Sequence, residues 1–544
     1  MKKIFSFFVL TVLFTSIVYA GGGSQQGGGL APGATEGGLP IVNNLLTITG
    51  ISQARDMRTM SNDIRVIQEL ERRTNIRIEW EAFPIQASER DIKFHAIVAS
   101  GDIPDLIDGG IGPNIVNRYG MQGLFLDFAP LLRQHAPNIT RAFDNPLEGD
   151  LLPYDINVWG EITARDGKIY NIPLISASNA IGAVWVIRTD WLQNVGLPMP
   201  TTVNDLYTVL RAFKDQNPSR TGAGNEIPFG AGQGGRTSRI LPMVNAFDAH
   251  MDLYVDYSDN RIKYGPVEPQ FREALTFLNR LYSEGLIESD YLTATNAQWL
   301  ARAGGNQMGI FLGWPASGLG GANNELQRLN SSFRFEPMPP IRSASGRQYK
   351  DTFITGNAVG YRTSANARTR YPVEIMRYLD YLFTPEGTLL NDFGIEGQTY
   401  NMVNGQPRYT DYIIRNPDGR DPETARVQFG MFFDLLPYQA GWSSHFQANE
   451  TVAPWTVQAW RTYQSPGLVE PPMPTLGLTE MELSRRASLV AEINTFKDPW
   501  IDRFIMGQEP LSRFDEFVAG IRRAGLDELL AMLNFAYDIY RANM

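Results

Sequence analysis

The first part of the chain changes repeatedly between two periods of apolar residues. Residues 43–51 (NNLLTITGI) read as a short buried strand, and residues 61–74 (SNDIRVIQELERRT) place apolar side chains on one helical side. Residues 75–83 (NIRIEWEAF) then alternate with the period of a strand. A strand, a helix and a second strand predict a βαβ unit with parallel strands. Residues 94–110 (FHAIVASGDIPDLIDGG) continue the pattern with the end of a helix and another buried strand.

The rest of the chain shows the same mixture of elements. A second α/β unit begins near residue 184, and Thr202 is expected to cap a helix with Asp205 three residues later. Residues 271–282 and 526–540 each form an apolar face at helical spacing. A chain of 544 residues exceeds what one hydrophobic core usually organises. The sequence therefore predicts an α/β fold in two domains or lobes, with additional helices near the C-terminus.

The N-terminus has the pattern of an export signal. Two lysines precede an apolar run, and Val18 and Ala20 have the small-residue spacing of a cleavage site. We therefore expect a signal peptide at residues 1–20 and a flexible glycine-rich linker at 21–40. With 0 cysteines, disulfides, thiolate metal sites and a lipid-modified cysteine are excluded. The mature protein is expected to be periplasmic or secreted, and not lipid-anchored.

Charge and motifs narrow the class of protein. The net charge of −10 and the isoelectric point of about 5.2 argue against a nucleic-acid partner. The four histidines, His95, His135, His250 and His445, have no metal-ligand spacing among them. The sequence contains neither a GxxxxGK[ST] phosphate loop nor a GxSxG elbow. Carboxylates are abundant, so a secreted glycoside hydrolase or lyase with two paired acids stays open as an alternative.

Eight stretches along the chain resemble a known family when they are taken together and in order. They are IQELERRTNIRIEWEAF, ASGDIPDLI, DGKIYNIP, VIRTDWLQNVGLPMPTTVNDL, MGIFLGWPAS, YLDYLFTPEG, GIEGQTYNMVNGQP, and the C-terminal WIDRFIMGQEPL with AYDIY. The family is that of the extracellular solute-binding proteins, family 1, of ABC importers, in particular the large, lipoprotein-like branch that includes alginate-oligosaccharide binders. One departure is clear, because many relatives carry a lipobox cysteine where this chain has YAGGG.

The resemblance implies a two-lobed periplasmic-binding-protein fold, type II-like, with the ligand cleft between the lobes. It implies one lobe at 41–175 with 352–405 and a second at 176–351 with 406–544. It further implies a monomeric receptor, not an enzyme, that delivers an oligosaccharide or another polar solute to the membrane subunits of an ABC permease by lobe closure. A peptide-binding receptor on a related two-lobed plan is the remaining alternative.

Residues 214–230 (KDQNPSRTGAGNEIPFG) contain a candidate calcium loop. Its oxygen-bearing side chains are those of Asp215, Asn217, Ser219, Thr221, Asn225 and Glu226. Relatives that this branch resembles often have a compact Ca²⁺ loop at this place, and Ca²⁺ takes six to eight oxygen ligands. Here two residues are inserted, and Arg220 stands where relatives favour glycine. The loop is therefore either a structural Ca²⁺ site or a polar helix-to-strand connection, and no cofactor other than Ca²⁺ is expected.

Sugars present flat apolar faces and rings of hydroxyls, so a sugar cleft needs aromatic platforms beside short polar side chains. Trp314 is the strongest candidate, because an apolar run ends at Gly313 and the tryptophan then stands in a Pro/Gly-rich loop. The further candidates are Trp442, Trp159, Asp102, Gln398 and Tyr400. Each also has a structural interpretation, namely core packing for the tryptophans, a turn cap for Asp102, and folding alone for Gln398 and Tyr400.

The charge of the ligand is not determined by these residues. A uronate sugar would need a basic group in the cleft, and Arg188, Arg236 or Arg239 are candidates whose direction the sequence does not give. Specificity is expected to come from aromatic stacking and from hydrogen bonds that a wrong ligand leaves unpaired, rather than from net charge.

Overall fold

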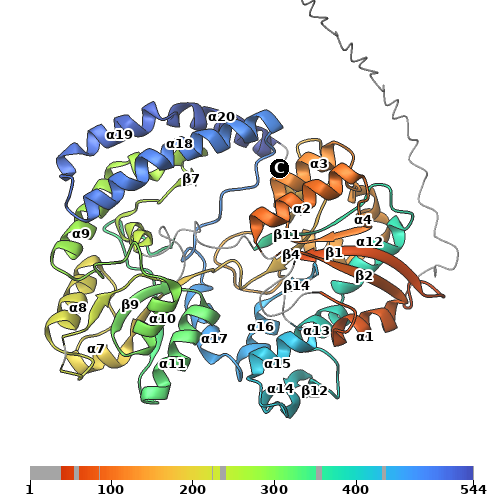
Figure 1. Ribbon diagram of the computed structural model, residues 1–544, viewed down its shortest axis with the longest axis horizontal. Helices are drawn as coiled ribbons and strands as arrows, with labels where there is room; N and C mark the ends of the chain where they lie inside the picture. The colour runs from red at the N-terminus through yellow and green to blue at the C-terminus, as the bar shows by residue number, and fades with distance from the viewer. Residues whose placement is uncertain are drawn as a thin grey trace, which may run out of the picture.

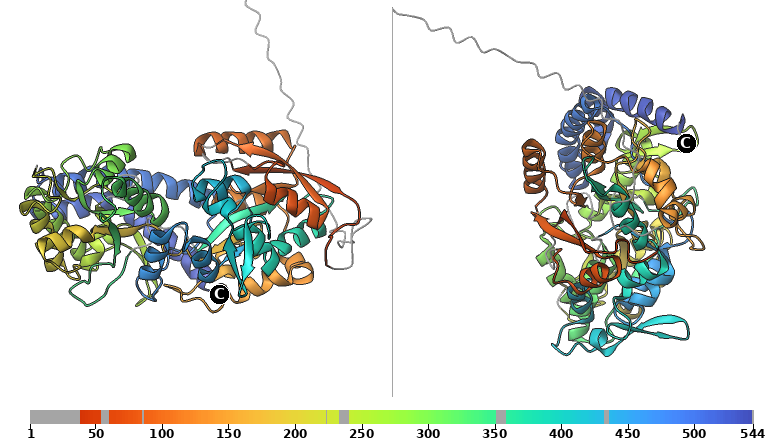
Figure 2. Two further views of the ribbon diagram at one scale, coloured as in Figure 1. Left: turned by 90° about the horizontal axis from the view of Figure 1, so that it is seen from below. Right: turned by 90° about the vertical axis from the view of Figure 1, so that its right-hand side faces the viewer.

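The computed structural model describes residues 38–53, 60–84, 86–222, 224–232, 240–350, 358–431 and 436–542. These residues form two lobes, each built around its own β-sheet, which lie side by side along the long axis of the molecule (Figure 1). The view from below shows the same two bodies end to end (Figure 2). The expected signal peptide at 1–20, and all but the last three residues of the expected linker at 21–40, lie outside the described residues.

The first lobe contains a six-stranded sheet. Its strands are β1 (Leu46–Gln53), β2 (Ile76–Phe83), β3 (Leu106–Asp108), β4 (Ile172–Ser176), β11 (Val359–Ala365) and β14 (Gln439–Ala440). The order is β14-β4-β11-β3-β1-β2. β1 pairs in parallel with β2 and β3, which confirms the βαβ prediction, and β11 runs antiparallel to β3 and β4.

Helices cover this sheet, and a hairpin extends from the lobe. The helices are α1 (Arg65–Thr74), α2 (Ala87–Ser100), α3 (Pro113–Met121), α4 (Ala129–His135), α5 (Pro137–Asp144), α6 (Val158–Ile162), α12 (Pro372–Leu382), α13 (Pro385–Phe393), α14 (Asp411–Ile414), α15 (Pro422–Phe429) and α16 (Trp442–Asn449). The hairpin consists of β12 (Tyr400–Val403) and β13 (Gln406–Tyr409), and it projects at the lower edge of the right-hand view in Figure 2.

The second lobe contains a four-stranded sheet in the order β10-β5-β9-β6. These strands are β5 (Val184–Arg188), β6 (Ile227–Phe229), β9 (Met308–Gly313) and β10 (Phe335–Met338), and a separate pair consists of β7 (Leu253–Asp256) and β8 (Arg261–Tyr264). The helices are α7 (Thr189–Val195), α8 (Val203–Asp215), α9 (Pro269–Ser283), α10 (Asn296–Gly304), α11 (Gly321–Leu329), α17 (Pro454–Tyr463), α18 (Glu480–Ile505), α19 (Phe514–Arg523) and α20 (Leu526–Ala542). Short helical turns are η2 (Leu241–Phe247), η3 (Gly265–Val267), η4 (Pro315–Gly320) and η6 (Leu511–Arg513).

Local sequence explains where these helices begin and which face they bury. α8 begins with the expected capping box: the Thr202 hydroxyl accepts the Asp205 N–H at 3.2 Å, and the Asp205 carboxylate accepts the Thr202 N–H at 3.0 Å. α1 buries Val66, Ile67 and Leu70, which share one side of the helix. The apolar face of each helix therefore decides which side packs on its sheet.

Three segments connect the lobes. The chain crosses from β4 to β5, returns from β10 to β11, and crosses again from α16 to α17. The range 406–544, which the resemblance assigned to the second lobe, is divided between the lobes. β14 pairs in parallel with β4 of the first sheet, β13 pairs with β12, and α16 packs on α13 and β13. The residues from β13 to α16 are therefore described with the first lobe.

The last three helices lie against the second lobe and reach toward the first (Figure 1). α18 packs on α9, and α20 packs on β8. At the start of α18, Glu480 lies 3.6 Å from Arg118 of α3, so these helices meet the first lobe beside the inter-lobe boundary. Within the described ranges, the structure has no helix that is both long and apolar enough to cross a membrane.

Candidate functional site

Trp314 lies at the carboxyl end of a strand in the second lobe. It follows β9 directly, and the residue is 39% exposed. The Trp314 carbonyl accepts the N–H groups of Gly318 at 2.8 Å and Leu319 at 2.9 Å, which holds its backbone in the η4 turn. A Cβ on Gly313 would lie 3.2 Å from the Gly318 Cα, so the close return of this turn favours glycine. An exposed indole on a well-held backbone at a strand end is suited to binding a ligand.

The structure places Trp442 in the core. Its side chain is only 3% exposed, its Nε1 donates to the Leu151 carbonyl at 2.8 Å, and its backbone N–H donates to the Asp150 carboxylate at 2.8 Å. The indole stacks on Phe446 with ring centroids 5.5 Å apart and lies 5.7 Å from Trp460 of α17. Every face of this ring is therefore used in packing, and the small polar residues beside it in the sequence do not expose it.

Trp159 is half-buried on α6 at the boundary between the lobes. Its Nε1 donates to the Asp144 carboxylate at 2.9 Å, and its ring meets the Phe143 ring edge-on at 5.1 Å. The same indole lines a cavity of about 270 Å³ that is also lined by Tyr540 of α20. Trp159 is thus held by the first lobe and faces a cavity that the second lobe closes.

The other candidate residues occupy different places. Asp102 is exposed in the turn before the amino end of β3, the edge opposite the carboxyl ends of the parallel strands, and its N–H donates to Ser100 Oγ at 3.2 Å. Gln398 is exposed just before the β12–β13 hairpin. Tyr400 begins that hairpin, is 6% exposed, and packs on Phe393 with ring centroids 5.8 Å apart. Asp102, Gln398 and Tyr400 thus lie on the first lobe, whereas Trp314 lies on the second.

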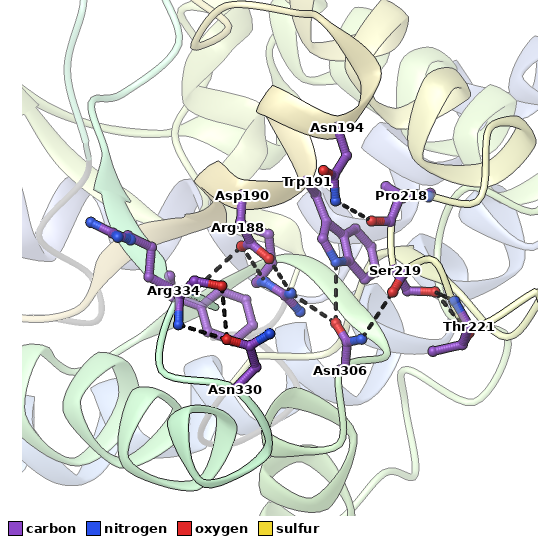
Figure 3. Close-up of polar contacts among 12 residues, drawn as sticks. Arg188, Asp190, Trp191, Asn194, Pro218, Ser219, Thr221, Asn306, Asn330 and Arg334 are labelled. Carbon is purple, nitrogen blue, oxygen red and sulfur yellow. Dashed lines mark hydrogen bonds and ion pairs between the residues drawn. The ribbon is translucent and has the colours of Figure 1, made fainter.

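Three arginines are candidates for binding a uronate carboxylate, and the one among them that the structure describes, Arg188, does not reach a cleft. Arg188 is fully buried, with Nη2 at 2.6 Å from the Asp190 carboxylate and 2.8 Å from Asn306 Oδ1 (Figure 3). Burial lowers the pKa of Arg188, although the Asp190 carboxylate opposes this effect. Arg236 and Arg239 lie outside the described residues. Arg188 is therefore a structural cation of the second lobe.

The candidate calcium loop gathers several oxygen atoms. Ser219 Oγ lies 2.8 Å from Thr221 Oγ1, donates to Glu226 Oε1 at 2.6 Å, and lies 3.4 Å from Asn217 Oδ1. The second Glu226 carboxylate oxygen is buried without a hydrogen-bond partner. From inside the lobe, Asn306 Nδ2 donates to the Ser219 carbonyl at 3.2 Å, which joins the loop to Arg188 (Figure 3).

The remaining loop residues point elsewhere. Asp215 forms an ion pair with Arg211 at 2.7 Å, and Asn225 is exposed. Arg220 is exposed with a φ of 57°, so its charge lies on the solvent side of the loop. No group of three or more His, Cys, Asp or Glu side chains within the described residues could hold a metal ion. A Ca²⁺ ion here would therefore depend on one carboxylate, that of Glu226, and on neutral oxygens.

Sequence reasoning missed an aromatic cavity between the lobes. Tyr154 of the first lobe and Tyr257, Tyr537 and Tyr540 of the second lobe line a cavity of about 430 Å³. Tyr537 and Tyr540 were visible only as part of the apolar stripe of a C-terminal helix. The one available signal was that tyrosine, unlike leucine, brings a hydroxyl that needs water or a partner.

A buried serine–histidine pair bears on the possibility of catalysis. His445 Nε2 lies 3.3 Å from Ser176 Oγ, but the two residues are only 2% and 4% exposed. Burial, together with the charge of Arg426, lowers the pKa of His445 to about 3. A histidine that is sealed from solvent and neutral at physiological pH is poorly placed to act as a general base on a substrate.

Asp392 is a buried acid that links α13 to α16. Its carboxylate accepts a short hydrogen bond from Ser444, while Oδ1 has no hydrogen-bond partner. Burial raises the pKa of Asp392 to about 7, although hydrogen bonds from Ser444 and Tyr438 oppose the shift. The folded protein therefore holds this proton more tightly than the unfolded chain does.

We predict that Asp392→Asn removes a pH-dependent loss of stability. The pKa of Asp392 is raised in the folded state, so protonated Asp392 stabilises the folded protein relative to ionised Asp392. This stabilisation is complete below about pH 4, the pKa of an aspartate in the unfolded chain, and it is lost as the pH rises through about 7. Between pH 4 and pH 8 the free energy of unfolding of the wild type should fall, relative to the variant, by on the order of 3 kcal/mol. Urea unfolding at several pH values measures this difference. Parallel pH profiles for the two proteins would contradict the prediction.

Comparison with known proteins identifies the family. The model of the bacterial extracellular solute-binding proteins matches residues 57–389. FusA, a fructooligosaccharide ABC transporter substrate-binding protein of Streptococcus pneumoniae, is 22% identical over 504 residues, which cover 89% of this chain and 88% of FusA. Lipoprotein LipO of Bacillus subtilis is 25% identical over 492 residues, which cover 85% of this chain and 86% of LipO.

Solved structures share the fold. The alginate-binding protein AlgQ2, determined without calcium ion, matches 91% of this chain and 99% of its own length with a TM-score of 0.68 and 24% identity. An EF-hand mutant of FusA in complex with fructo-nystose matches 92% of this chain and 100% of its own length, with a TM-score of 0.68 and 20% identity. The two-lobed α/β fold is thus that of periplasmic-binding-protein-like substrate-binding proteins. Since the family model matches more than half of the chain, this protein belongs to the bacterial extracellular solute-binding protein family.

Proposed function

We propose that this protein is an exported, monomeric receptor that captures an oligosaccharide between its two lobes and delivers it to the membrane subunits of an ABC permease. The observation that carries the proposal is the position of Trp314 at the carboxyl end of β9. Its indole is exposed, and its backbone carbonyl is fixed by hydrogen bonds from the η4 turn. Such a ring offers a flat apolar face for the C–H side of a sugar. The relatives that are named for what they bind are saccharide-binding proteins, and none of the relatives described above is named as an enzyme.

Lobe closure is the part of this proposal that delivery requires. A ligand that contacts both lobes stabilises the closed conformation, in which the lobes approach one another. A permease can then recognise the surface that the closed conformation presents. The three crossing segments allow such a movement, because each joins the lobes by a single run of chain.

We predict that Trp314→Ala weakens oligosaccharide binding by about tenfold or more, because loss of an aromatic platform removes both apolar contact and stacking. Isothermal titration calorimetry with a panel of oligosaccharides measures this change. Leu329→Ala is the matched control, since Leu329 is 60% exposed on the same lobe at the end of α11. Turnover of the saccharide without stoichiometric binding would instead support a hydrolase or lyase, and binding of peptides alone would support a peptide receptor.

We also propose that the loop around Ser219 binds Ca²⁺ weakly as a structural ion. The support is the convergence of the Asn217, Ser219, Thr221 and Glu226 oxygens and the buried Glu226 oxygen that has no hydrogen-bond partner. A site with one carboxylate is expected to bind in the range of about 10⁻⁴ to 10⁻³ M. When bound, the ion would supply charge to neutralise Glu226 and a centre on which the loop oxygens order.

We predict that, after chelation, about 10 mM Ca²⁺ stabilises the wild type by on the order of 1 kcal/mol, because an ion that binds the folded state alone raises its stability. Thermal unfolding measures the rise in Tm. Glu226→Gln should abolish it, whereas Glu273→Gln, at an exposed carboxylate on α9, should not. An unchanged wild-type Tm would show that the loop is only a polar connection.

A further inference from the structure

Two adjoining cavities lie on the boundary between the lobes, and we call them together the seam cavity. The larger has a volume of about 430 Å³ and the smaller about 270 Å³, and both are lined by Asn157 and Tyr540. The first lobe contributes α6 and the residues before it, while the second contributes α20, the turn after β7 and the segment that leads to α18. Ligand pockets commonly have volumes of about 300–1,000 Å³ and lie between domains.

Aromatic rings form much of the wall of the seam cavity. Tyr537 and Tyr540 stand three residues apart on α20, with ring centroids 6.1 Å apart and planes inclined by only 15°. Tyr257 approaches from the turn after β7 with 56% of its side chain exposed, and Trp159 closes the smaller cavity from α6. Tyr537 is 5% exposed and supports Tyr540 from behind, so the part-exposed rings are those of Tyr540 and Tyr257. A part-exposed ring provides a flat apolar face, which is the surface that a sugar ring needs.

Polar groups in this wall are free to bind a ligand. The side chains of Asp155 and Tyr257 make neither a hydrogen bond nor an ion pair with any described residue, and both are exposed. In contrast, Tyr540 is already held beside Asn157, and its hydroxyl lies 3.0 Å from where a Cβ on Gly160 would be. Burial raises the pKa of Tyr540, so its phenol remains protonated at neutral pH. The cavity therefore combines a well-held aromatic platform with an unengaged hydroxyl and an unengaged carboxylate.

The charge of the wall distinguishes between classes of sugar. The larger cavity is lined by the carboxylates of Asp155 and Glu161 and by no lysine or arginine among the described residues. The smaller cavity has Arg165, but this guanidinium is paired with Glu482 at 3.0 Å. Glu161 is itself engaged, since it accepts the Thr475 hydroxyl at 2.9 Å. An acidic wall repels a uronate carboxylate, whereas it accepts hydrogen bonds from the hydroxyls of a neutral sugar.

We propose that the seam cavity binds a neutral sugar unit, stacked on the rings of Tyr257 and Tyr540 and hydrogen-bonded to Asp155, and that it selects uncharged over uronate oligosaccharides. This inference rests on the proposed saccharide-receptor function. Because Asp155 belongs to the first lobe and both tyrosines belong to the second, a sugar in this place bridges the lobes.

The test uses two variants at exposed residues that have no structural partner, Tyr257→Ala and Asp155→Asn. The control is Phe535→Ala, because Phe535 is 57% exposed on α20 and lines neither cavity. Calorimetric titration of the full chain uses the neutral trisaccharides kestose, maltotriose, xylotriose and mannotriose, and the acidic trisaccharide of galacturonate.

We expect at least one neutral trisaccharide to bind about tenfold or more tightly than trigalacturonate. Tyr257→Ala should weaken the affinity for the neutral trisaccharide about fivefold or more. Asp155→Asn should reduce the ratio of the affinity for the neutral trisaccharide to that for trigalacturonate. Phe535→Ala should change neither the affinity nor the ratio.

If a neutral sugar binds, and Tyr257→Ala and Asp155→Asn both bind it as the wild type does, the seam proposal alone is overturned. Equal or tighter binding of trigalacturonate would also overturn it. Failure of the folded wild type to bind any saccharide would overturn the receptor function and this inference with it.

Discussion

The aromatic packing between α16 and α17 is the contact on which the arrangement of the lobes depends. The ring centroids of Trp442 on α16 and Trp460 on α17 lie 5.7 Å apart. At the far end of α17, the Tyr463 hydroxyl donates to the Met338 carbonyl of β10 at 2.5 Å and accepts the Trp185 N–H of β5 at 3.1 Å. Burial raises the pKa of Tyr463, so the phenol keeps the proton that it donates. α17 thereby ties the second sheet to helices of the first lobe, and η4, which follows Trp314, packs on α17.

The two sides of the inter-lobe boundary differ in the kind of contact that they contain. Around α17 the contact is buried and aromatic, and the hydrophobic core runs through it without interruption. On the side of α18 and α20 the lobes meet through ion pairs that solvent reaches, namely Arg165 with Glu482 and Arg118 with Glu480. Such exposed pairs contribute only about 0–1 kcal/mol each. In the proposed closure the lobes would therefore rotate about α17. The gap between them on the polar side, where the seam cavity lies, would open or close.

Buried charge explains why the loop around Ser219 has a definite shape. Arg188 is paired with Asp190, and its second partner, Asn306, holds the Ser219 carbonyl. A buried guanidinium is costly when its hydrogen bonds are not made, and Nη1 of Arg188 is already buried without a partner. The bond from Nη2 to Asn306 Oδ1 therefore keeps Asn306 in one orientation. The loop is thus organised from within the lobe, and an ion bound to Glu226 would add to an arrangement that the protein already has.

The sequence by itself determined the elements and the class of the protein. Periodicity predicted the βαβ unit of β1, α1 and β2, and the capping box at Thr202 is present as expected, because both depend on residues that are neighbours in the chain. The eight sequence stretches that resemble the solute-binding family, in the same order, identified the solute-binding fold. Tertiary structure alone decided which tryptophan faces solvent. Trp314 and Trp442 both stand among small residues, yet Trp442 is buried because its helix packs on Trp460 of α17 and its Nε1 meets the distant Leu151 carbonyl. The seam cavity is likewise assembled from four separate segments, and no local pattern records which side chains long-range packing will bring together.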